Sequence, residues 1–274
     1  ALLASGAPIS AMNAIRKQVS RIKGGRLARA ALPAKVVSLV VSDVPGDEPA
    51  QVASGPTVPD ASDRKAALDM ISLYGIQLSD RIMSFLKTAP EDAPTEVLGD
   101  VHVIASASIS LAAAANLARN QGVTPVTLSD AIEGEARDIG MMHAAIASEV
   151  CLRNQPFKAP VVILSGGETT VSIGAKAGGK GGRNSEFLLA FAGGIEGQNA
   201  LALAADTDGI DGSEDNAGAF ADGESWARMR KAGVDPVVLL SNHDAWTAFD
   251  AVGELFVPGP TGTNVNDFRA ILIR

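Results

Sequence analysis

Carboxylates gather in two turns of the sequence, 43–47 and 206–215, and each turn directly follows an apolar run. Acidic side chains at the carboxyl end of a strand can bind Mg²⁺ or take a proton from a hydroxyl group. The second turn is not an EF-hand, because Ile210 and Ala217 stand at two of the ligand positions. The alternative for both turns is a capped turn with solvated acids.

A glycine-rich loop between an apolar run and a helix offers the complementary chemistry. The run 161–164 ends in Ser165-Gly166-Gly167 and Glu168, and residues 174–182 then bring five glycines before Arg183. Backbone N–H groups there, together with Lys176, Lys180 and Arg183, suit a phosphate or a carboxylate. The loop is not a P-loop, because Gly181 stands where Ser or Thr would bind the metal. A flexible hairpin is the alternative.

A third candidate is the basic face of a helix predicted to begin at Ser10. Its apolar face is formed by Met12, Ile15, Val19 and Ile22, and its other face by Arg16, Lys17, Arg21 and Lys23. Such a face is ordinarily solvated. Because Gly24 and Gly25 follow it, we also consider a phosphate as its ligand.

Composition limits the classes of protein that can carry these groups. The 274 residues are 46% hydrophobic, which predicts two domains with sizeable cores. The net charge of −8 argues against nucleic acid as a partner, and no apolar run is long enough for a membrane span. A single cysteine, Cys151, excludes an internal disulfide and favours a reducing cytoplasm.

The predicted elements alternate between strands and helices, with a Pro-rich linker at 88–95. This alternation of strands and helices predicts an α/β fold with a parallel sheet covered by helices on both faces. We place the domain boundary in the linker, which gives domains 1–95 and 96–274. Strands are expected at 36–41, 101–105, 124–128, 161–164, 201–205, 254–257 and 269–273, and helices at 62–74, 79–86, 106–120, 133–151, 186–192, 219–232 and 242–250.

Several motifs together resemble the MOFRL-type glycerate kinases, whose members are often labelled hydroxypyruvate reductases. They are MNAIRKQVSRIKGG at 12–25, SDVPGD at 42–47, SGPTVPD at 54–60, SGGETTV at 165–171, GKGGRNSE at 179–186, DTDGIDG at 206–212 and TGTNVNDF at 261–268. The resemblance implies two three-layer α/β/α domains. The first is Rossmann-like and lacks its N-terminal part, and the second has a mixed sheet similar to molybdopterin-binding domains.

The resemblance also implies an ATP-dependent kinase that phosphorylates D-glycerate, most often at the 2-hydroxyl, with Mg²⁺ in a cleft between the domains. We therefore expect glycerate and a nucleotide as partners, a homo-oligomer as one option, and neither nucleic acid nor a membrane. The residues carried over are Asp43, Asp47, Glu168 and Arg183 as catalytic, Gly166, Gly167, Lys180, Gly181, Gly182, Asn184, Thr261, Gly262, Thr263 and Asn264 as ATP-binding, and Asp206, Asp208 and Asp211 as metal ligands.

Within these roles, Arg183 and Lys180 are expected to contact phosphate or the substrate carboxylate, and Asp43 or Asp47 to act as base. The chain departs from the family in two ways. Ser185 replaces the usual Gln after Arg-Asn, and nothing before Ala1 supplies the family's N-terminal glycine-rich turn and lysine. Two other functions stay open, a hydroxypyruvate reductase and a non-catalytic anion- or pterin-binding module. Against the reductase, the sequence has no dinucleotide fingerprint after a strand.

Overall fold

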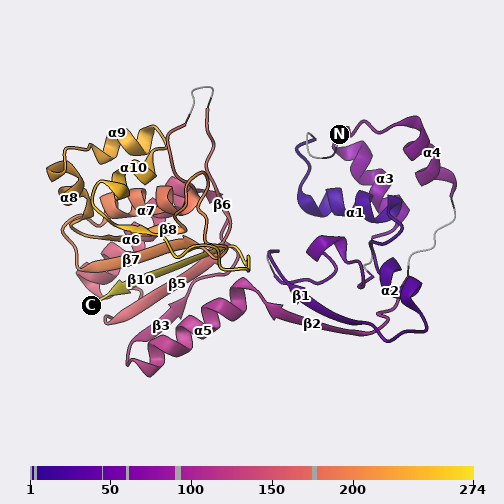
Figure 1. The fold of residues 1–274 in the computed structure, drawn as a ribbon, viewed down its shortest axis with the longest axis horizontal. Coiled ribbons are helices and arrows are strands. Elements are labelled where there is room, and N and C mark those ends of the chain that lie inside the picture. Colours follow the sequence, from indigo (N-terminus) through magenta and orange to yellow (C-terminus); the bar gives the residue numbers. More distant parts are fainter. Residues whose placement is uncertain (1, 3–4, 45, 60–61, 90–93, 175–177) are drawn as a thin grey trace. The chain divides into compact units, whose positions relative to one another are not determined.

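The computed structural model describes residues 2, 5–44, 46–59, 62–89, 94–174 and 178–274. These form two compact units, Ala1–Ile104 and Ala105–Arg274 (Figure 1). The boundary predicted after residue 95 lies earlier than this division. The reason is that the strand from Asp100 onward pairs with a strand of the first unit.

The first unit packs three helices around a small core and adds a two-stranded ribbon. Ile15, Ile71 and Leu86 are buried at the centre of that core. The ribbon is formed by β1 and β2, and the apolar side chains of β1 that predict a buried strand are instead largely exposed. The elements are α1 (Ile9–Val19), α2 (Arg26–Ala31), β1 (Val37–Val41), the 3₁₀ turn η2 (Val52–Ser54), α3 (Arg64–Leu73), α4 (Asp80–Thr88) and β2 (Asp100–Ala105).

The basic face of α1 differs from the expected solvated surface at one position. Lys17 is only 1% exposed, and burial lowers the pKa of its ammonium group to about 8. Arg26, also buried, donates from Nη1 to the Lys17 carbonyl oxygen (2.8 Å) and so ties the end of α1 to α2. Lys17 is thus part of the interior of this unit.

The second unit is built on a six-stranded sheet in the order β3-β5-β10-β7-β8-β9. Only β3 and β5 are parallel, and each of the other neighbouring pairs is antiparallel. The sheet is therefore mixed, as the resemblance implies, and the all-parallel sheet expected from the alternation of elements is wrong. Its strands are β3 (Thr124–Thr127), β5 (Val161–Gly167), β7 (Ala200–Asp206), β8 (Gly218–Asp222), β9 (Leu255–Phe256) and β10 (Asp267–Ile273).

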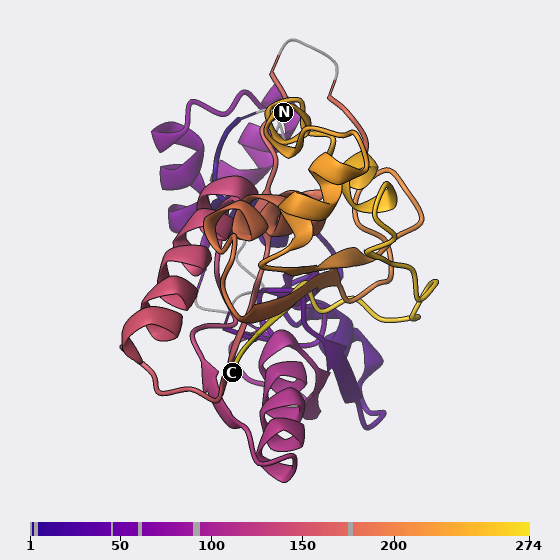
Figure 2. The same cartoon turned by 90° about the vertical axis from the view of Figure 1, so that its left-hand side faces the viewer.

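Helices cover the two faces of this sheet unequally, as the turned view shows (Figure 2). On one face, α6 and α7 pack together over the central strands. On the other face, α5 packs on β3, β5 and β10. The helices are α5 (Ala107–Asn120), α6 (Ala136–Arg153), α7 (Arg183–Gly194), α8 (Ser225–Lys231), α9 (Pro236–Ser241) and α10 (Ala245–Asp250), and a short strand pair links β4 (Gly134–Glu135) to β6 (Thr169–Thr170).

One predicted helix is partly wrong. The segment 219–232 begins as strand β8, and only its second half forms α8. In β8, Ala219 and Ala221 point into the core while Phe220 lies on the opposite face, which is the period-2 pattern of a strand. Alanine has a high helix propensity, but pairing of this segment with β7 overrides it. None of the described helices is long and apolar enough to cross a membrane.

Candidate functional site

Strand register brings two carboxylates together where the central strands β7 and β10 meet at one end of the sheet. Asp267, the first residue of β10, pairs with Asp206 at the end of β7 and with Gly167 at the end of β5. Residues directly opposite each other on antiparallel strands have neighbouring side chains, and two like charges in that position repel. The two carboxylates therefore need a cation between them to offset their repulsion.

Arg183, the first residue of α7, supplies that cation. Its Nε donates to Asp267 Oδ1 (2.8 Å), its Nη2 to Asp206 Oδ2 (2.6 Å) and its Nη1 to Glu168 Oε1 (2.8 Å). The three partners differ in burial, because Asp267 is buried and Asp206 nearly so, whereas the Glu168 side chain is 53% exposed. The structure thus joins three of the predicted site residues, Glu168, Arg183 and Asp206, around one guanidinium group.

Asp267 is held from its other side by a second arginine. Arg269 lies two residues along β10 on the same face, has no exposed side-chain surface, and donates from Nη2 to Asp267 Oδ2. It also donates to Thr169 Oγ1 (3.2 Å), and its guanidinium lies 5.0 Å from the ring centroid of Phe187. Burial lowers the pKa of Arg269, and the carboxylate of Asp267 opposes that effect. Arg269 is therefore a buried counter-charge that holds Asp267 beneath Arg183.

Burial and neighbouring charges shift the pKa values of the residues in this cluster. Burial raises the pKa of Asp206 to about 7, the nearby Asp267 adds to the rise, and Arg183 opposes it. For Arg183, burial acts to lower the pKa, but the carboxylates of Asp267, Asp206 and Glu168 outweigh burial and raise it. Arg183 is consequently a permanent cation, while the carboxylate of Asp206 can change its charge near neutral pH.

Asp211 caps the start of α7. Its Oδ1 accepts from the backbone N–H of Asn184 (2.9 Å), and its Oδ2 accepts from the N–H and the hydroxyl of Ser185 (2.8 and 2.6 Å). Gly182 makes room for it, because a Cβ there would lie 2.4 Å from the carbonyl carbon of Asp211. The carboxylate thus occupies the place where the sequence predicts a ligand phosphate, and it fixes the position of Arg183.

The glycine-rich loop before α7 is also bonded within the protein. The N–H of Gly179 donates to the Asn242 carbonyl (2.9 Å), and the N–H of Lys180 donates to Asp244 Oδ1 (3.0 Å). The Lys180 ammonium lies 4.5 Å from the ring centroid of Trp246. The Lys180 ammonium also lies 3.8 Å from Glu214 Oε1, and its side chain is 55% exposed. Lys176 lies outside the described residues.

The acidic turn and the Thr/Asn-rich loop lie side by side. Thr207 accepts at Oγ1 from the N–H of Val265 (2.8 Å), and Thr261 donates its hydroxyl to the Thr207 carbonyl oxygen (2.5 Å). The N–H of Thr261 donates to the Asp208 carbonyl (3.1 Å). The predicted ATP-binding residues 261–264 are thus brought next to Asp206 and Asp208.

Asp43 and Asp47 belong to the first unit, in the turn after β1. Asp43 is exposed, and Asp47 is half-buried with a left-handed backbone (φ 53°). Their expected role as base remains a prediction.

A buried histidine supports the strand end that carries Gly166 and Gly167. Nδ1 of His143 lies 2.8 Å from the carbonyl oxygen of Ile139, and because a carbonyl only accepts, Nδ1 must carry the proton. Nε2 then accepts from the hydroxyl of Ser165 (3.0 Å). Burial lowers the pKa of His143 to about 4, so the ring is neutral at physiological pH.

Asp267 and Arg269 are not among the site residues predicted from the sequence. A usable signal is present in DFRAILI, where positions 267, 269, 271 and 273 share one face of a strand. Two of these positions hold charges and two hold isoleucine. Charged residues at core positions of a strand indicate a paired, buried network, since an unpaired buried charge is costly.

The carboxylates suit Mg²⁺ only together with a ligand. Among the described residues, no three Asp, Glu, His or Cys side chains form a group that could hold a metal ion alone. Asp211 is 1% exposed, and both its oxygens are engaged at the start of α7. Asp206 and Asp208 also accept hydrogen bonds, from Arg183 and from the N–H groups of Asp208 and Ile210, but they are less buried and their carboxylates keep lone pairs for a metal. Mg²⁺ is usually bound by one or two carboxylates plus phosphate oxygens and water, so these two residues fit a metal that arrives with a nucleotide.

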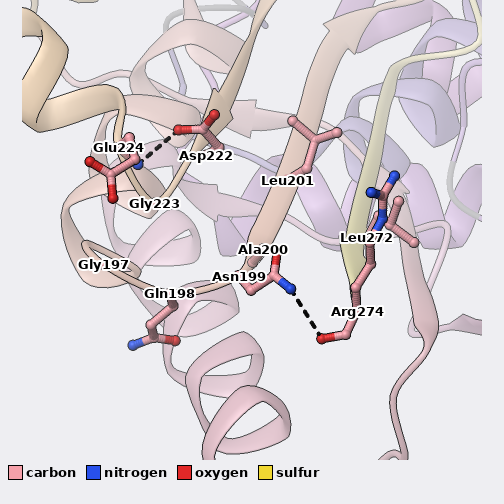
Figure 3. A pocket seen from close by; sticks show the side chains of 10 residues that line it. All are labelled: Gly197, Gln198, Asn199, Ala200, Leu201, Asp222, Gly223, Glu224, Leu272 and Arg274. Atoms are coloured by element: carbon pink, nitrogen blue, oxygen red, sulfur yellow. Dashed lines mark hydrogen bonds between the residues drawn. The ribbon is translucent and has the colours of Figure 1, made fainter.

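Another cavity of the second unit lies away from this cluster. It has a volume of about 420 Å³ and surrounds the other end of β7 and β10, where Asn199 Nδ2 donates to the Arg274 carbonyl (Figure 3). Ala200 and Leu201 line it, whereas the charged cluster lies at Asp206, the opposite end of the same strand. The cluster is therefore a separate site.

The structure is that of an α/β protein with a cluster of charged residues at the ends of its central strands, and comparisons with known proteins agree with this fold. A family model described as "MOFRL family" matches residues 161–267, and one described as "Domain of unknown function (DUF4147)" matches 1–87. A "Putative hydroxypyruvate reductase" of Agrobacterium vitis is 54% identical over 100% of this chain and 63% of its own length. "D-glycerate 2-kinase" of Thermotoga maritima is 39% identical over 100% of this chain and 65% of its own length.

A crystal structure of glycerate kinase from Thermotoga maritima superimposes with a TM-score of 0.89 at 38% identity, covering 100% of this chain and 65% of that one. A second Agrobacterium vitis relative is 53% identical over 71% of its length. The chain belongs to the MOFRL-type glycerate kinase family. It spans about 63% of the first relative's length.

Proposed function

We propose that this chain is the larger part of a kinase that transfers the γ-phosphoryl group of ATP to D-glycerate, at the 2-hydroxyl, with Mg²⁺. The observation that carries the proposal is the Arg183 cluster. Phosphoryl transfer needs two anionic substrates held in line and their charge neutralised as it moves, and it needs little covalent chemistry from the protein. A fixed guanidinium among carboxylates at strand ends supplies such an arrangement.

Within the cluster, we assign Arg183 to a substrate anion. Asp267 and Asp206 hold two of its nitrogens from buried positions, whereas Nη1 is paired with the exposed Glu168. Glu168 can move into solvent at little cost, because exposed ion pairs contribute only about 0–1 kcal/mol. A phosphate or the glycerate carboxylate can then take its place on Nη1.

Asp206 and Asp208 would hold Mg²⁺ together with nucleotide phosphates, and the metal would neutralise charge on those phosphates. Lys180 is assigned to phosphate, residues 261–264 to the nucleotide, and Asp43 or Asp47 to proton removal from the glycerate hydroxyl. The cytoplasm, with its ATP and reduced thiols, stays our predicted compartment.

The test uses the full-length protein with D-glycerate, ATP and Mg²⁺, with ADP release as the readout. Phosphorus–proton NMR of the product distinguishes phosphate on carbon 2, coupled to one proton, from phosphate on carbon 3, coupled to two. Arg183→Ala should lower kcat/KM by about 10²–10³-fold. Arg153→Ala, which removes an exposed i,i+4 pair with Glu149, is the matched control.

A loss of only a few fold in Arg183→Ala contradicts the anion role. The same preparation with hydroxypyruvate and NADH should leave the absorbance of NADH unchanged, and a decrease supports the reductase instead.

A further inference from the structure

We propose that a cavity on the outer face of the sheet, beside the Arg183 cluster, binds the base and ribose of the nucleotide. This inference rests on the proposed kinase function and adds to it the position of the nucleoside. The cavity has a volume of about 350 Å³, within the range of about 300–1,000 Å³ that is typical of small-molecule pockets.

The floor of the cavity is apolar because of strand alternation. Leu203 and Ala205 of β7 and Phe268 of β10 all project to the outer face, and Ala205 pairs directly with Phe268. On one side, Ser110 of α5 forms the wall, and on the other Phe256 of β9 does so. Because α5 packs on β3, β5 and β10, the outer face of β7 beside it is left open at this point.

The lining matches a nucleoside better than glycerate. Flat aromatic bases bind between apolar and aromatic side chains, which Leu203, Phe256 and Phe268 provide. Hydroxyl-bearing residues, Thr261 and Thr263, stand at the rim, where a ribose would lie. Glycerate is a small polar anion and would gain little from such a surface, so it is assigned to the charged side of the strand ends.

The cavity and the cluster share one residue, Asp206, whose carboxylate lies on the opposite face of β7 from the cavity floor. Asp206 lines the cavity, and its Oδ2 lies 2.6 Å from Nη2 of Arg183. A nucleotide with its base on the outer face therefore directs its phosphates towards Asp206, Asp208 and Arg183, where Mg²⁺ and the acceptor are proposed to bind. The base and the phosphates would lie on the two sides of the end of β7.

The walls are already fixed without a ligand. Thr207 Oγ1 accepts from the N–H of Val265 (2.8 Å) and donates to the Asn266 carbonyl (2.7 Å), and Thr261 is bonded to Thr207 in turn. The loop that closes the cavity is thus tied to the strand that forms its floor. A preformed pocket costs less ordering entropy when it binds, which favours a ligand site.

The experiment titrates the chain with adenosine, which has no phosphate, and separately with tripolyphosphate plus Mg²⁺. Methyl NMR signals of Leu203, Ala205 and Val265 report the cavity. We expect adenosine to shift these signals and tripolyphosphate to leave them unchanged. Leu203→Trp, which fills the cavity, should weaken adenosine binding by at least about tenfold.

Leu201→Trp is the matched control, because it places the same side chain on the same face of β7 but in the cavity of Figure 3. Adenosine binding should change less than about twofold in this variant. If Leu203→Trp does not fold, Ser110→Trp fills the cavity from α5, with Asn116→Trp on the exposed part of that helix as its control.

Two outcomes overturn the inference: adenosine leaves the methyl signals of all three residues unchanged, or the cavity variants and their controls weaken its binding equally. Failure of the proposed function would look different. A protein that binds adenosine in this cavity but does not phosphorylate glycerate refutes the kinase assignment and leaves the nucleoside site in place. If the protein phosphorylates glycerate but its affinity for the nucleotide is unchanged by Leu203→Trp, only the nucleoside site is refuted.

Discussion

Asp267 and Glu168 are bonded to the same arginine but should contribute very differently to stability. Asp267 accepts from Arg183 Nε (2.8 Å), Asn184 Nδ2 (2.8 Å), Arg269 Nη2 and the N–H of Thr169 (3.3 Å), and its side chain has no exposed surface. Asp267→Asn keeps the shape but turns an amide N–H₂ towards these donors, and it leaves buried Arg269 without its hydrogen-bonded counter-charge. Removing one partner of a buried ion pair costs about 3–5 kcal/mol.

Glu168→Gln also removes one carboxylate that pairs with the Arg183 guanidinium, but this carboxylate is exposed. The change should therefore lower the free energy of unfolding by only about 0.2–1 kcal/mol. Urea unfolding followed by tryptophan fluorescence measures both values, since Trp226 and Trp246 both lie in the second unit and report on it alone. Equal costs for the two variants would refute the view that burial of Asp267, rather than its charge on Arg183, holds this site together. If the pair is coupled as described, Asp267→Asn combined with Arg269→Met should cost less than the sum of the single changes.

Three further predictions concern the supports of the site. Between pH 6.5 and about 4, His143 binds a proton in the unfolded chain but stays neutral in the folded one. The free energy of unfolding of the second unit should therefore fall as pH falls, by up to about 3 kcal/mol. In urea titrations at pH 7 and 4.5, His143→Gln should lose less of this free energy than the unchanged protein. Gly167→Ala should cost more than about 2 kcal/mol, because its Cβ would lie 2.2 Å from the Ile132 nitrogen at φ +118°, whereas Gly122→Ala, with open space around it, should cost about 1 kcal/mol or less. Asp211→Asn should lower the free energy of unfolding by about 1–2 kcal/mol with or without Mg²⁺, and a tenfold weaker Mg²⁺ dependence of activity at unchanged stability would instead make Asp211 a metal ligand.

Element types were predictable from the sequence where pattern and propensity agree. The apolar runs at 161–164 and 201–205 and the helix at 62–74 are found, with ends shifted by a few residues. The segment 219–222 was not predictable in this way, since alanines carry no period-2 signal of their own and only pairing with β7 makes them a strand. The direction of β10 is likewise set by partners distant in the sequence.

The site was predictable in its residue types but not in its internal pairing. Glu168 and Asp206 stand out at the ends of strands, and Arg183 at the start of a helix, because glycines or acids flank them. That Asp211 would cap α7, and that the loop N–H groups would bond to Asn242 and Asp244, depends on tertiary contacts that no local pattern encodes. Asp267 was missed because a single acid at the start of an apolar strand resembles an ordinary surface residue until its register is known.

The position of β10 has a consequence for how the protein is made. This strand lies in the middle of the sheet between β5 and β7, although it follows both of them in the chain. During synthesis on the ribosome, β5 and β7 emerge well before the strand that joins them, and their unpaired edges are open to wrong partners meanwhile. Assembly of the second unit therefore waits for residues 267–273, and the same late step that closes the sheet also delivers Asp267 to Arg183.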